Sequence, residues 1–62
     1  MDRGEVILRL KEHLRARKQQ NGELKKGDLF YCITYVMDFL LLSKEQAKQF
    51  VAENIPDIAK LC

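Results

Sequence analysis

The longest apolar run of the chain, residues 29–42, constrains the fold more than any other feature. Its sequence, LFYCITYVMDFLLL, is apolar or aromatic except at Thr34 and Asp38. As an α-helix the run rises about 21 Å, whereas the hydrocarbon core of a bilayer is about 30 Å thick. We therefore interpret it as a buried core helix and expect no membrane span. Because the rest of the chain is amphipathic or polar, we expect it to fold around this helix.

The same run has a composition that also suits a β-strand, since FYCITYV is rich in β-branched and aromatic residues. A helical wheel nevertheless separates its side chains into an apolar arc of more than 200° and a second arc of about 100°. The second arc holds Tyr31, Thr34, Tyr35 and Asp38. The apolar arc holds Leu29, Phe30, Cys32, Ile33, Val36, Met37, Phe39, Leu40 and Leu41. A strand would divide the second set between two faces, so we expect a helix over residues 29–42 with Asp28 as its N-cap.

A first amphipathic helix is predicted over residues 3–20. Its apolar stripe has the i, i+3/i+4 spacing of one helical face and consists of Val6, Ile7, Leu10 and Leu14. Asp2 is a suitable N-cap for this helix. Gly22 can adopt the left-handed conformation that ends a helix.

A third helix is predicted over residues 44–54. Ser43 and Gln46 have the spacing of a capping box, which indicates a helix start immediately after Ser43. Proline disfavours helical geometry in the residue before it, so Pro56 ends this helix and opens a last helical turn over residues 56–61. Only Ser43 then separates the second and third helices, which predicts a sharp turn between them.

These elements predict an all-α fold for the single domain 1–62, namely a small three-helix bundle with a C-terminal helical turn. The apolar content of 47% is enough to form a core and argues against disorder. The helix over residues 29–42 lies in the middle, with the first helix on one flank and the third helix and final turn on the other. A chain of 62 residues is near the lower limit for folding alone. Self-association through leftover apolar side chains such as Leu8, Leu41 and Leu42 therefore stays open, and a homodimer is one expectation.

The sequence contains no set of residues typical of an enzyme, a metal site or a cofactor site. His13 is the only histidine, and Cys32 lies on the apolar side of its helix, so we interpret both as packing residues. The three glycines are scattered and form no phosphate-binding loop. Two cysteines without a signal peptide are typical of a reduced cytoplasmic protein, although a Cys32–Cys62 disulfide stays open.

The function that this composition favours is a small protein-interaction or regulatory module with a protein partner. A carboxylate beside two phenols on one helical face suits a protein contact, because aromatic side chains are enriched in such interfaces. The candidate partner-binding residues are Tyr31, Tyr35, Asp38 and Leu42.

DNA or RNA binding is the alternative. Residues 9–26 contain seven Lys or Arg against two Glu, a net charge of +5, while the whole chain carries only +2. The candidate phosphate-binding residues are Lys11, Arg15, Lys18, Lys25 and Lys26. The corner at Ser43 resembles a helix-turn-helix, but the helix over residues 44–54 has no arginine and carries two glutamates. This alternative therefore ranks second.

Overall fold

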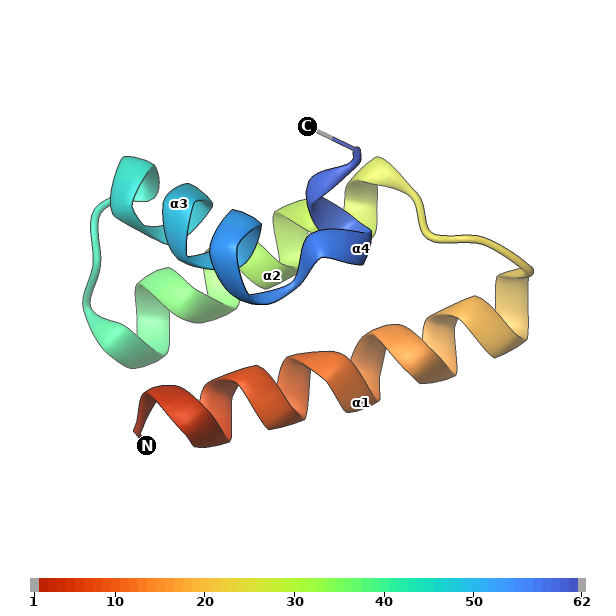
Figure 1. Ribbon diagram of the computed structural model, residues 1–62, viewed down its shortest axis with the longest axis horizontal. Coiled ribbons are helices and arrows are strands. Elements are labelled where there is room, and N and C mark those ends of the chain that lie inside the picture. Colours follow the sequence, from red (N-terminus) through yellow and green to blue (C-terminus); the bar gives the residue numbers. More distant parts are fainter. Residues whose placement is uncertain (1, 62) are drawn as a thin grey trace.

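The computed structural model describes residues 2–61, and within this range all of the regular secondary structure is α-helical, as predicted (Figure 1). The helices are α1 (Arg3–Asn21), α2 (Lys26–Leu40), α3 (Lys44–Asn54) and α4 (Pro56–Ala59). The run FYCITYV lies within α2, so the helical interpretation is confirmed and the strand is excluded.

The helices pack around α2, which contacts α1 on one flank and α3 and α4 on the other (Figure 1). All four contribute to one core, which consists of Val6, Leu10, Leu14, Leu29, Cys32, Ile33, Val36, Ala47, Phe50, Val51, Ile55 and Ile58. The predicted bundle of three helices with a terminal turn is thus confirmed. None of the helices in residues 2–61 combines the length and the apolarity that a membrane span requires.

The ends of α1 form as their residues predict. The Asp2 carboxylate accepts a hydrogen bond from the Glu5 backbone N–H at 2.8 Å, which satisfies one of the unpaired donors of the first turn. Gly22 adopts φ +81° and donates its backbone N–H to the Lys18 carbonyl at 2.7 Å. Glycine has no Cβ to clash in this left-handed conformation, so it closes the helix without steric strain.

The start of α2 corrects the sequence-based prediction. The helix begins at Lys26, and Asp28 is its third residue rather than its N-cap. The buried Asp28 carboxylate accepts hydrogen bonds from the Lys25 backbone N–H at 2.9 Å and from Arg17 Nε at 3.1 Å. The bond from Lys25, and the Arg17 guanidinium beside it, hold the pKa of Asp28 below its usual value, although burial opposes this. Asp28 thus ties the end of α1 to the start of α2.

The end of α2 also differs from the prediction. The helix stops at Leu40, because Leu41 adopts the left-handed conformation with φ +55°. The connection to α3 is therefore residues 41–43 rather than Ser43 alone. Leucine rarely adopts this conformation, so its type gives no signal for a helix end at this position.

The start of α3 and the start of α4 are where they were predicted. The Gln46 backbone N–H donates to Ser43 Oγ at 3.2 Å, and the Ser43 N–H donates to Gln46 Oε1 at 3.1 Å, which completes the capping box. Pro56 is the first residue of α4, and Ile58 is fully buried against the other helices. The helix ends at Ala59, earlier than the predicted 61.

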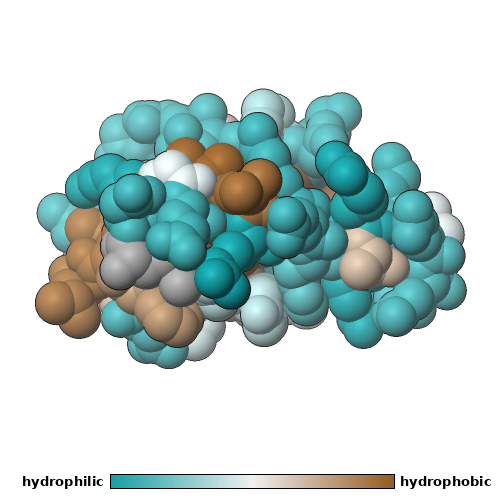
Figure 2. Space-filling view, turned by 90° about the horizontal axis from the view of Figure 1, so that it is seen from below, coloured by the Kyte–Doolittle hydropathy of each residue, from teal (hydrophilic) through white to brown (hydrophobic). Residues whose placement is uncertain are grey.

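The neighbouring helices cover only part of the wide apolar arc of α2, and Leu41 is one of the leftover apolar side chains expected from the sequence. Phe30, Phe39 and Leu41 are all exposed. The arc exceeds what α1, α3 and α4 can cover, because each neighbour contacts a helix along a limited stripe. In Figure 2 hydrophobic side chains gather toward the end of the molecule where α2 passes into α3, while the opposite end is hydrophilic.

Candidate functional site

The side of α2 that faces away from the core, together with the turn after it, forms one continuous exposed surface. We define this surface, the outer face of α2, by Phe30, Tyr31, Thr34, Asp38 and Leu41, all of which are exposed. Residues three, four and seven apart lie on the same side of a helix, so the four members within α2 are neighbours along its length, and Leu41 follows in the turn after it. The outer face is therefore a mixed apolar and polar surface with a single carboxylate.

A row of aromatic rings borders the outer face along the seam with α1. The His13 imidazole stacks on the Tyr31 ring with centroids 4.0 Å apart and planes 17° apart. Tyr31 and Tyr35 have centroids 6.0 Å apart, and Tyr35 and Phe39 have centroids 4.5 Å apart. Such tilted and offset pairs are the favoured arrangements of aromatic rings. Contacts within the row fix the position of the Tyr31 ring. His13 packs against this ring, in line with the packing role expected from the sequence.

The four candidate partner-binding residues do not form one cluster. Tyr31 and Asp38 lie on the outer face, and Tyr35 lies beside them, half-buried in the aromatic row. Leu42 instead packs against the core and borders a shallow hollow next to α3. Phe30 is an exposed member of this surface that the wheel had placed on the apolar arc, and Leu41 is exposed as expected of a leftover apolar side chain.

Opposite charges lie near the two ends of α2, at positions whose spacing of four residues continues the line of Phe30 and Thr34 on the outer face. Lys26 lies at the first turn of α2 and Asp38 at the last. The two ion pairs within residues 2–61 are Arg9–Glu5 and Arg17–Asp28, so neither of these end charges is paired within that range. Both remain available to charges on another molecule.

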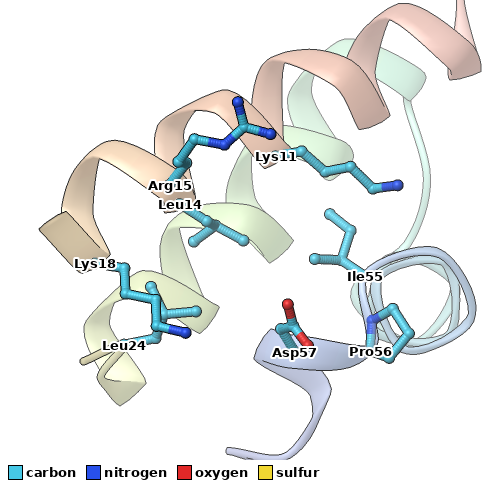
Figure 3. Close-up of a pocket in the computed structure, with 8 residues that line it drawn as sticks. All are labelled: Lys11, Leu14, Arg15, Lys18, Leu24, Ile55, Pro56 and Asp57. Atoms are coloured by element: carbon cyan, nitrogen blue, oxygen red, sulfur yellow. The ribbon is translucent and has the colours of Figure 1, made fainter. Parts of the chain in front are cut away.

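A second site, separate from the outer face of α2, is lined by basic side chains of α1 and by residues of α4. Lys11, Arg15 and Lys18 lie along one side of a groove, which we call the basic groove (Figure 3). Its other lining residues are Leu14, Leu24, Ile55, Pro56 and Asp57. The structure thus brings together three of the five candidate phosphate-binding residues, while Lys25 and Lys26 lie outside the groove at the start of α2.

The buried Cys32 has the surroundings of a packing residue rather than a nucleophile. Its side chain is a free thiol in the core, and Cys62 lies outside the described residues. Burial, together with the nearby Asp28 carboxylate, raises the pKa of Cys32 to about 11. A thiol with that pKa is protonated at neutral pH and reacts slowly, because the thiolate is the nucleophilic form.

In the described part of the chain no group of three or more His, Cys, Asp or Glu side chains is placed to hold a metal ion.

Comparison with models of protein families, with curated proteins and with solved structures finds no match to this chain. The function is therefore inferred from the surfaces of the molecule itself.

Proposed function

We propose that this chain is a small, non-catalytic helical interaction module that pairs with a second copy of itself through the outer face of α2. The observation that carries the proposal is exposed apolar area, since Phe30 is 59% exposed and Leu41 is 88% exposed. A chain of 62 residues has few large apolar side chains to leave in water. Large apolar side chains left exposed on one surface are typical of a contact surface.

The end charges favour a second copy as the partner. When two α2 helices pack antiparallel about a two-fold axis, the same surface is used twice and each end meets the opposite end. Lys26 of one copy then lies opposite Asp38 of the other, and this contact forms twice. Antiparallel packing also brings opposite ends of the two helix dipoles together. The outer face is thus complementary to itself in charge.

The middle of the outer face fits the same arrangement. If residue 26 faces residue 38 of the other copy, then residue 30 faces residue 34. The Phe30 ring of one copy therefore lies over Thr34 of the other, whose small side chain leaves room for it. The contacts between Phe30 and Thr34 then lie between the two charge pairs, as is usual in a protein interface, and Leu41 lies just beyond Asp38 at the rim.

Charge-swap variants test this pairing. Lys26→Glu and Asp38→Lys each place like charges opposite one another twice, so each is expected to weaken self-association about tenfold. The double variant restores opposite charges and is expected to regain the wild-type dissociation constant to within about threefold. Sedimentation equilibrium between about 1 µM and about 1 mM measures all four chains.

Lys48→Glu is the matched control, because Lys48 is exposed on α3 and lies outside the outer face. It is expected to leave the dissociation constant unchanged. A wild-type chain that stays monomeric over the whole concentration range contradicts the proposal. So does a double variant that associates no better than the two single variants.

Leu41→Gly separates the stability of the monomer from its self-association. Leucine is strained at φ +55°, and glycine is not, so the variant is expected to raise the free energy of unfolding by about 0.5–1 kcal/mol. The loss of the exposed leucine is expected to raise the dissociation constant. Urea unfolding at a concentration where the chain is monomeric gives the first quantity, and sedimentation gives the second.

Leu42→Gly is the control for the Leu41 variant and is expected to act in the opposite direction on folding. Leu42 packs against the core, so its removal lowers the free energy of unfolding. A Leu41→Gly chain that unfolds more easily than wild type would show that Leu41 stabilises the monomer rather than the contact.

A further inference from the structure

The basic groove between α1 and α4 forms a second surface with the features of a peptide-binding site. We infer that it binds a short acidic segment of another protein that carries an apolar anchor. The groove shares no residue with the outer face of α2, so the two sites can be tested separately.

The groove has a basic rim on one side. Lys11, Arg15 and Lys18 follow the i, i+4, i+7 spacing, which places them on one side of α1. In Figure 3 they come from α1, while Ile55, Pro56 and Asp57 border the groove across from them. The groove has a volume of about 400 Å³, which lies within the range of ligand-binding pockets.

The charges of the rim are available to a ligand. All three basic side chains are exposed, and within residues 2–61 none of them forms an ion pair. Asp57 is the acidic residue among those that line the groove, which leaves an excess of two positive charges. Carboxylates complement this excess, and the planar Arg15 guanidinium can bind one with two parallel hydrogen bonds.

The floor of the groove is aliphatic. It consists of Leu14, Leu24, Ile55 and Pro56, of which Leu14 and Ile55 are buried, Leu24 is half-buried and Pro56 is exposed. An apolar side chain that enters the groove removes its own surface and part of this floor from water. The groove therefore matches a segment in which acidic residues flank one or two leucines.

A nucleic acid matches the groove less well. None of the lining residues is aromatic, so unpaired bases have no ring on which to stack. The aliphatic floor makes no contact that a phosphate backbone uses. These features favour an acidic peptide over the basic-strip interpretation of the sequence.

Fluorescence polarisation with defined ligands tests the inference. The first ligand is a labelled peptide of Glu and Asp residues around a central Leu-Leu pair, and the second carries Ser-Ser in its place. The Leu-Leu peptide is expected to bind about tenfold more tightly than the Ser-Ser peptide. A DNA duplex and a single-stranded RNA are the third and fourth ligands, and both are expected to bind more weakly than the Leu-Leu peptide near physiological salt.

Variants of residues that line the groove test whether the peptide binds there. The double variant Lys11→Glu with Arg15→Glu is expected to weaken peptide binding at least about tenfold, because attraction becomes repulsion. Asp57→Asn removes the opposing carboxylate and is expected to strengthen binding about threefold. Lys48→Glu, on α3 outside the groove, is the matched control and is expected to change nothing. Circular dichroism checks that each variant remains helical.

Three outcomes overturn the inference. Equal affinity for the two peptides shows that the aliphatic floor takes no anchor. Tighter binding of the duplex or the RNA, with a steep dependence on salt, shows a phosphate-binding surface instead. Peptide affinity that is unchanged by both the double variant and Asp57→Asn places the peptide outside the groove.

Discussion

Replacing Leu10 by Ala is expected to lower the free energy of unfolding by about 3 kcal/mol. Leu10 is fully buried in the core, between Val6 and Leu14 on the inner face of α1. Its truncation removes apolar contacts and leaves a cavity that the surrounding helices fill only in part. A chain of 62 residues is stable by about 3–9 kcal/mol, so the variant is expected to keep only about 0–6 kcal/mol and to unfold at a clearly lower urea concentration than wild type.

Leu8→Ala is the matched control for this experiment. It makes the same chemical change two residues away in α1, but Leu8 is 57% exposed. Its expected effect is below about 0.5 kcal/mol. Urea unfolding followed by circular dichroism compares both variants with wild type. Equal effects at the two positions would contradict this packing of α1, because they would require both faces of the helix to be equally buried.

The contrast between Leu8 and Leu10 could be predicted from the sequence, because it depends only on the spacing of apolar residues. The stripe predicted for α1 contains the three residues of that helix that are buried, Val6, Leu10 and Leu14. Caps that act through a local hydrogen bond were predicted for the same reason, as at Asp2 and Ser43. Such signals lie within four residues of the feature that they determine.

Features that depend on distant segments could not be predicted. The left-handed Leu41 has no sequence signal, and the helix end that it marks became visible only in the structure. The wheel of α2 gave the width of its apolar arc but not the places where α1 and α3 lie, so Phe30 and Phe39 were assigned to the interior. Where neighbouring helices lie is set by tertiary packing, which the periodicity of one helix does not contain.

In the two candidate surfaces, too, the features set by local spacing were predicted and those set by distant segments were not. Lys11, Arg15 and Lys18 lie on one side of α1, as their spacing predicted. The aliphatic floor that turns this strip into a groove includes Ile55 and Pro56, which are far away in the sequence. On α2 the tyrosines and Asp38 were identified from the wheel and Leu41 as a leftover apolar side chain, whereas the exposed Phe30 was not.

Asp28 is the second position at which a large effect is expected, and its role also depends on a distant residue. Asp28→Ala is expected to lower the free energy of unfolding by about 2 kcal/mol at neutral pH. The change leaves the Lys25 backbone N–H and the Arg17 guanidinium without the buried acceptor that both use. Because Arg17 itself is partly exposed, water compensates for some of the loss.

The same interaction makes the contribution of Asp28 depend on pH. The pKa of Asp28 in the folded chain lies below its ordinary value of 3.8, because the Lys25 N–H and Arg17 both favour the carboxylate. The folded chain therefore releases the proton more readily than the unfolded chain does, and the stabilisation is complete above about pH 5. As the pH falls below about 4, the unfolded chain binds the proton first and the stabilisation is lost.

Urea unfolding of wild type and Asp28→Ala between about pH 2 and pH 7 measures this dependence. The difference in unfolding free energy between the two chains is expected to be largest at neutral pH and to shrink below about pH 4. Asp38→Ala, measured at a concentration where the chain is monomeric, is the matched control, since Asp38 lies on the same helix but is exposed and has no ion pair within residues 2–61. Its difference from wild type is expected to stay small at every pH, because solvent replaces whatever the carboxylate contacts. A difference for Asp28→Ala that does not change with pH would show that the residue acts through packing alone, since only the ionised carboxylate can hold Arg17 and the Lys25 N–H at full strength.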